Sequence, residues 1–75
     1  MQWNLIRLRK ENHETQSDIA KLLNISIDGY RLKEHGKSQF KLNEMFIISE
    51  HYGLNLDDIF LPTKYTLSKH KVEER

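Results

Sequence analysis

The chain has 75 residues, no cysteine and a formal net charge of +1, with 12 Lys/Arg against 11 Asp/Glu. That length suits one small domain with a marginal core, and the lack of cysteine excludes disulfides and thiolate metal ligands. No apolar run approaches the ~18 residues that span a bilayer, and the amino terminus lacks a signal-peptide pattern. We therefore expect a soluble cytoplasmic protein that has no membrane partner.

Two helices are expected in the first third of the chain. The first covers residues 2–12, and its aromatic residue, Trp3, should pack in the core or at its edge. The second covers residues 15–23, because Thr15 and Asp18 have the residue types and spacing of a capping box. One apolar stripe follows the helical period in this second helix: Ile19, Ala20, Leu22 and Leu23.

A tight turn and a third helix follow. Asn24 stands where a left-handed C-cap is needed, and asparagine is the best choice there after glycine. Ser26 is a second N-cap, which predicts a helix over residues 26–34 that Gly36 ends. Tyr30 is the one large residue of this helix placed to pack back on the helix before it. Such a unit has the dimensions of a helix-turn-helix whose second helix enters a DNA major groove.

The rest of the chain predicts two more helices and a tail. The fourth helix covers residues 42–52, and a short fifth one begins after Asn55, where Asp58 completes a capping box. The domain then spans residues 1–61. The charged tail 62–75 is expected to become ordered only if it binds to the domain or to a dimer partner. It has too little apolar surface to offset the conformational entropy that it loses on ordering. Five residues share one face of the fourth helix: Leu42, Met45, Ile48, Ser49 and Tyr52.

In order and register, this pattern resembles the XRE family of phage-repressor and Cro-like domains. The resemblance covers residues 5–61 and implies an all-α, five-helix, lambda-repressor-like fold. It also implies a repressor-like transcriptional regulator, a homodimer on double-stranded DNA whose reading helix is about Ser26–Glu34. The matching residues are Leu5, Leu8, Arg9, Gln16, Ala20, Ile25, Ser26, Tyr30, Glu34 and Gly36.

Four positions depart from the family pattern. Asn24 replaces a glycine, Phe40 stands where proline is common, and both Glu14 and Lys33 replace apolar residues. Charge is also uneven along the chain: residues 1–40 carry a basic excess and residues 41–61 an acidic one. This asymmetry is either chance patterning or the mark of a basic half that faces phosphates.

In the third helix, the resemblance assigns base contacts to Ile27, Asp28, Arg31 and Leu32. Arg31 is equally suited to donate twice to guanine O6 and N7 or to hold a phosphate. Asp28 could accept from cytosine N4, or it could simply stabilise the positive end of its helix. Ile27 and Leu32 suit contacts with thymine methyl groups, although Leu32 would serve equally well packed against neighbouring helices.

Phosphate contacts are expected around that helix. Gln16 opens the second helix, where family members place a phosphate contact; the alternative is an ordinary exposed helix residue. Ser26, Lys37 and Lys10 are further candidates, and solvated lysine is the ordinary alternative for the last two.

The resemblance further implies a structural ion pair between Arg9, at the end of the first helix, and Glu34, at the end of the third. The dimer is expected to use Phe60 and Leu61, at the exit of the fifth helix, because the distal region has more apolar residues than one short helix buries.

Catalysis and metal binding are not expected, and no cofactor or small-molecule ligand is indicated. The chain has no glycine-rich phosphate loop and no nucleophile motif. The alternative to DNA binding is a protein-interaction module of the antitoxin or anti-repressor type, which apolar Ile27 and Leu32 would suit. The histidines are scattered without metal-ligand spacing: His13, His35, His51 and His70.

Overall fold

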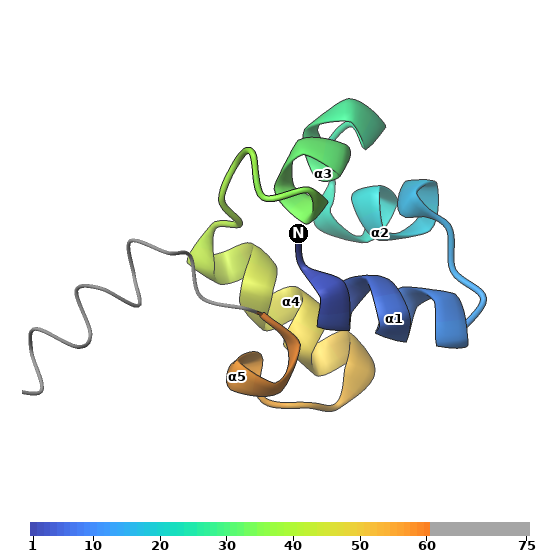
Figure 1. Cartoon of the computed structure of the whole chain (residues 1–75), viewed down its shortest axis with the longest axis vertical. Helices are drawn as coiled ribbons and strands as arrows, with labels where there is room; N and C mark the ends of the chain where they lie inside the picture. Colours follow the sequence, from blue (N-terminus) through green and yellow to red (C-terminus); the bar gives the residue numbers. More distant parts are fainter. Residues whose placement is uncertain (61–75) are drawn as a thin grey trace, which may run out of the picture.

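A computed structural model describes residues 1–60, and this part of the chain is all-helical and contains no strand (Figure 1). The all-α class and the number of helices expected from the sequence are confirmed. The expectations for Leu61 and for the tail 62–75 lie outside the described residues. The five helices are α1 (Trp3–Glu11), α2 (Gln16–Leu23), α3 (Ile27–Glu34), α4 (Leu42–Tyr52) and α5 (Leu56–Ile59).

The turn between α2 and α3 is built as its residues predict. The Thr15 hydroxyl accepts from the Asp18 amide at 3.1 Å, and the Asp18 carboxylate accepts from the Thr15 amide at 2.8 Å, which closes the capping box. Asn24 is left-handed with φ of 60°, so the chain reverses directly after α2. Ser26 then caps α3 by accepting from the Gly29 amide at 3.0 Å. These local features set where α2 begins and ends and where α3 begins.

The exit of α3 is tied to the start of the chain. Gly36 has φ of 84°, a conformation that costs a residue with a Cβ about 1–2 kcal/mol. The Gln2 amide donates to the Glu34 carbonyl at 2.9 Å, so the amino terminus lies beside the last turn of α3 (Figure 1). The segment before α1 therefore satisfies a carbonyl that a helix end leaves unpaired.

The two C-terminal helices begin differently. Glu44 accepts from the Lys41 amide at 2.8 Å and so fixes the first turn of α4. Asn55 is the N-cap residue of α5 but makes no side-chain capping bond, so the capping box expected with Asp58 is wrong. The Asp58 amide instead donates to the Asn55 carbonyl at 3.0 Å, which closes the first turn through the backbone alone.

The core lies between the helices and takes residues from all five of them and from the loop before α4. Tyr30 is fully buried, as expected, and its ring meets Phe40 edge-on at 6.1 Å between centroids. Phe40 meets Phe60 in the same way at 5.2 Å. This aromatic row holds the inner face of α3 on the body of the domain. The core residues are Leu5, Ile19, Ala20, Leu23, Tyr30, Phe40, Ile48 and Ile59.

Three apolar residues that were expected in the core, at its edge or on the apolar face of a helix are exposed instead. Trp3 is 60% exposed, because Leu5 and Arg9 form the buried side of α1 and Trp3 lies about 200° around the helix from Leu5. Leu22 and Leu42 are also exposed, at 37% and 60%. None of the helices within residues 1–60 is long and apolar enough to cross a membrane.

Candidate nucleic-acid interface

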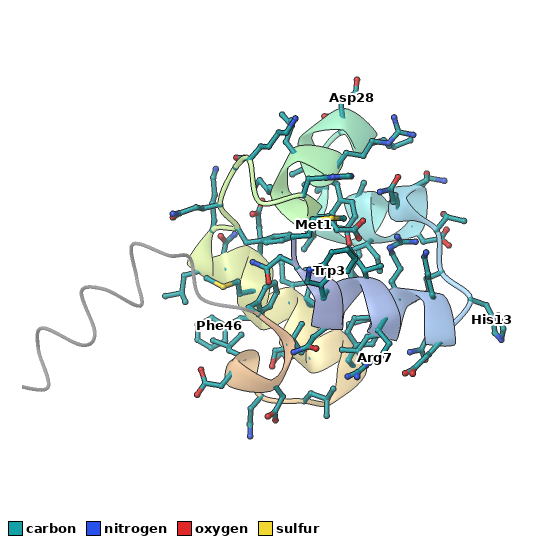
Figure 2. All side chains as sticks on the ribbon, viewed as in Figure 1. Met1, Trp3, Arg7, His13, Asp28 and Phe46 are labelled. Carbon is teal, nitrogen blue, oxygen red and sulfur yellow. The ribbon has the colours of Figure 1, made fainter. Side chains whose placement is uncertain are left out.

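The outer face of α3 consists of Ile27, Asp28, Arg31 and Leu32, which all lie on the exposed side of the helix. The sequence left open whether Leu32 meets DNA or packs against neighbouring helices. This residue is 49% exposed, so about half of it is accessible to a partner. Asp28 points outward at one end of the molecule, and Phe46 lies toward the other (Figure 2). A helix with one anchored face and one open face presents its open side chains in a fixed arrangement.

The charged residues of the outer face lie close to each other. Arg31 Nη1 is 3.6 Å from Asp28 Oδ1, in a solvent-exposed contact one helical turn apart. Arg31 Nε also donates to Gln16 Oε1 at 3.1 Å, which joins the outer face of α3 to the first residue of α2. The guanidinium of Arg31, a residue of α3, is therefore held by a hydrogen bond to α2.

Behind the outer face lies a buried polar network centred on Glu34, which is 2% exposed. Arg9 donates from Nε to Glu34 Oε2 at 3.0 Å and from Nη2 to Oε1 at 3.3 Å. Tyr30 donates its hydroxyl proton to Oε2 at 2.6 Å, and Gln16 donates from Nε2 to Oε1 at 3.0 Å. The structure thus brings Arg9 and Glu34 together as a fork-to-fork pair with two further donors.

The electrostatics of this network favour charged Arg9 and Glu34. Burial raises the pKa of Glu34, but hydrogen bonds from Arg9, Tyr30 and Gln16 outweigh it and hold that pKa below its ordinary value. Burial acts to lower the pKa of Arg9, and the bond to Glu34 more than reverses this. Burial, followed by the bond to Glu34, raises the pKa of Tyr30, so its hydroxyl stays a donor.

The four phosphate candidates differ in their surroundings. The Gln16 side chain uses both ends of its amide within the protein, on Glu34 and on Arg31. The Ser26 hydroxyl is exposed and also caps α3. Lys37, just beyond the end of α3, and Lys10, near the end of α1, are exposed. Ser26 and Lys37 therefore lie near the two ends of α3.

A second buried ion pair at the exit of α3 was not foreseen. Lys33 Nζ lies 2.5 Å from Glu44 Oε1, and the two side chains are 12% and 5% exposed. Burial raises the pKa of Glu44, but hydrogen bonds from Lys33 and from the Lys41 amide outweigh it and leave a net lowering. The signal available in the sequence was Lys33, a charged residue where the resemblance leads one to expect an apolar one, since a buried charge needs a partner of opposite sign.

The other unexpected charge, Glu14, ties the loop after α1 to the end of α4. Tyr52 donates its hydroxyl proton to Glu14 Oε1 at 2.7 Å, and His51 Nε2 lies 2.5 Å from Glu14 Oε2. Burial, followed by the bond to Glu14, raises the pKa of Tyr52. Glu14 and Lys33 thus form polar contacts that join different helices or loops of the domain.

Of the two dimer candidates, only Phe60 belongs to the described residues. It is half-buried and packs on Phe40, so part of its surface serves its own domain. Three apolar side chains on α1 and α4 are more exposed than Phe60: Trp3, Leu42 and Phe46. Within residues 1–60, the structure shows no group of three or more His, Asp or Glu side chains arranged to hold a metal ion.

This fold also occurs in a protein of known structure. No family model matches the chain, and no curated protein matches its sequence. Among solved structures, the chain is similar to the crystal structure of a transcriptional regulator from Listeria innocua, with a TM-score of 0.72 and 20% sequence identity. The match covers 95% of this chain and 71% of that one.

Proposed function

We propose that the protein is a repressor-like transcriptional regulator that binds operator DNA by placing α3 in the major groove. The observation that carries this proposal is the outer face of α3. Four side chains that suit base edges stand on a short helix whose other face is anchored by Tyr30 and Glu34. The capped turn between α2 and α3 and the fold shared with a solved regulator support the same conclusion.

In this proposal the outer face of α3 meets base edges and its surroundings meet phosphates. Arg31 donates to guanine, and Ile27 and Leu32 contact thymine methyl groups. Lys37 and Lys10 supply charge to the phosphates, while Ser26 and Gln16 supply polar contacts near the starts of α3 and α2. The phosphate contacts set the register of α3, and the base contacts set its sequence preference.

The functional unit is proposed to be a homodimer. One eight-residue helix reaches few base pairs, and a second copy doubles the contacts. Two-fold symmetry would then select half-sites about 10 bp apart, one helical turn of DNA. Phe60 and Leu61 remain the proposed contact, with the exposed part of the Phe60 ring as the portion available to a second copy.

A second candidate function is a protein-interaction module of the antitoxin or anti-repressor type. It is favoured by the two exposed apolar residues of the outer face, because Ile27 is 39% and Leu32 is 49% exposed. Apolar side chains in the centre of an interface with a charged rim are typical of protein partners.

Binding to mixed-sequence duplex DNA across a salt series distinguishes the two functions. A DNA-binding regulator should bind at low salt and lose affinity steeply as salt rises, because phosphate contacts release counterions. The comparison protein is the double variant Arg31→Ala/Lys37→Ala. Its affinity should fall less steeply with rising salt concentration, because two candidate contacts to DNA are removed. A protein that fails to retard duplex DNA even at low salt would contradict the proposal and favour the interaction module.

A further inference from the structure

Gln16 links the buried network to the outer face of α3. Its Nε2 donates to Glu34 Oε1 at 3.0 Å, and its Oε1 accepts from Arg31 Nε at 3.1 Å. Glu34 is itself held by both Arg9 and Tyr30, so one end of the Gln16 amide rests on a fixed, buried acceptor. The other end meets a residue of the outer face.

The orientation of this amide follows from the chemistry of its two neighbours. Ionised Glu34 only accepts hydrogen bonds, and the guanidinium of Arg31 only donates them. A flipped amide would put oxygen against the carboxylate and NH₂ against the guanidinium, and both contacts would be repulsive. The carbonyl oxygen of Gln16 therefore has to face Arg31 as long as Glu34 is charged.

This contact decides which edge of Arg31 is left for DNA. A guanidinium can meet guanine O6 and N7 through Nε and one Nη, or through its two Nη atoms. Because Gln16 occupies Nε, the edge formed by Nη1 and Nη2 is the one that remains. The contact of Nη1 with Asp28 is exposed and long, at 3.6 Å, so it competes weakly with a base.

We propose that Gln16 is a positioning residue for base recognition, which holds Arg31 so that it reads guanine through Nη1 and Nη2. The inference rests on the proposed function. It adds that Gln16, by holding Arg31, determines the specificity at one base pair. The second amide hydrogen of Gln16 remains available for a phosphate. A single residue would then couple the register of the backbone contact to the direction of the base contact.

The test compares sequence preference in wild type, Gln16→Met, Arg31→Ala and the double variant. Each is given a pool of randomised duplexes at moderate salt, and affinities are measured for the selected site and all its single-base variants. Methionine keeps the length of Gln16 and removes both hydrogen bonds. Lys37→Met is the matched control, since it removes a phosphate candidate outside the Gln16 network. Melting curves check that each variant is folded, and Gln16→Ala replaces the methionine variant if that one is not.

We expect Gln16→Met to lower discrimination about 5- to 150-fold at one base pair per half-site, the position that Arg31→Ala also relaxes. The double variant should match Arg31→Ala at that position, and Lys37→Met should weaken all sequences equally. A uniform loss in Gln16→Met, with the preference intact, would overturn the inference alone and leave Gln16 a phosphate contact. Failure of wild type to select any duplex would overturn the proposed function as well.

Discussion

The pair formed by Arg9 and Glu34 should be the most costly polar contact to break in this domain. Glu34→Ala leaves the guanidinium of Arg9 without its carboxylate partner at a site where the residue is 8% exposed, and of its hydrogen bonds within residues 1–60 only that from Nη1 to the Glu14 carbonyl remains. Removing one partner of a buried ion pair costs about 3–5 kcal/mol. The Tyr30 hydroxyl also loses its acceptor inside the protein, which adds about 1–3 kcal/mol.

That loss is comparable with the whole stability of a domain of this size, which is about 0.05–0.15 kcal/mol per residue. Glu34→Ala is therefore expected to be largely unfolded, and the milder changes Glu34→Gln and Arg9→Met are the ones to measure. Urea unfolding of both single variants and the double variant, followed by far-ultraviolet circular dichroism, gives the coupling free energy. We expect a favourable coupling of about 1–3 kcal/mol.

The matched control is the exposed pair of Arg7 and Glu11, one helical turn apart on α1 and separated by 4.0 Å. Its coupling should stay below about 0.5 kcal/mol, because exposed pairs are screened by water and salt. A coupling between Arg9 and Glu34 no larger than this control would mean that their side chains do not meet in solution. The placement of α3 would then be wrong.

Four further outcomes follow from the same geometry. Arg31→Ala should relax one position of the DNA site by about 1–3 kcal/mol of discrimination, measured on single-base variants, whereas a uniform loss would make Arg31 a phosphate contact. Lys37→Ala should weaken all duplexes alike and reduce the salt slope by about one; an unchanged slope would remove Lys37 from the interface. The pKa values of Glu34 and Glu44 are lower in the folded state than their ordinary value of 4.5. Their contribution to stability is therefore full above pH 4.5 and lost as the pH falls through the folded pKa values, and urea unfolding midpoints that do not fall in acid would contradict this. Leu61→Glu should give a folded monomer with weaker operator binding, measured by sedimentation and titration, and retained dimers would place the interface elsewhere.

Most of the helix boundaries were predictable from short sequence patterns. The Thr15 and Asp18 box, the left-handed Asn24 and the Ser26 cap were predictable because each depends on residues a few positions apart. Trp3 shows the limit of this reasoning, since it was expected in the core or packed at its edge and is 60% exposed. Leu5 and Arg9 are the buried residues of α1 and define the side that faces the core. Only the packed structure shows which side this is.

The site was predictable in part. The outer face of α3 was predicted from the family resemblance. The resemblance also implied the pair of Arg9 and Glu34 behind this face. The contacts of Lys33 with Glu44 and of Glu14 with Tyr52 were not predicted, because each joins residues from different parts of the sequence. A lone charge at an apolar position indicates that a partner is needed, but it does not say which one. The hydrogen bond between Gln16 and Arg31 likewise depends on the distance and angle at which α2 and α3 cross, which the sequence does not specify.

The measurement that tests the central proposal most directly is selection of genomic fragments by the wild-type protein at moderate salt, followed by footprinting of the retained sites. Reading by α3 predicts protection in two major-groove segments about 10 bp apart, related by two-fold symmetry. It further predicts that Arg31→Ala loses protection at a guanine within each segment. Fragments retained without a common sequence, or no retained fragment at all, would contradict sequence recognition by α3.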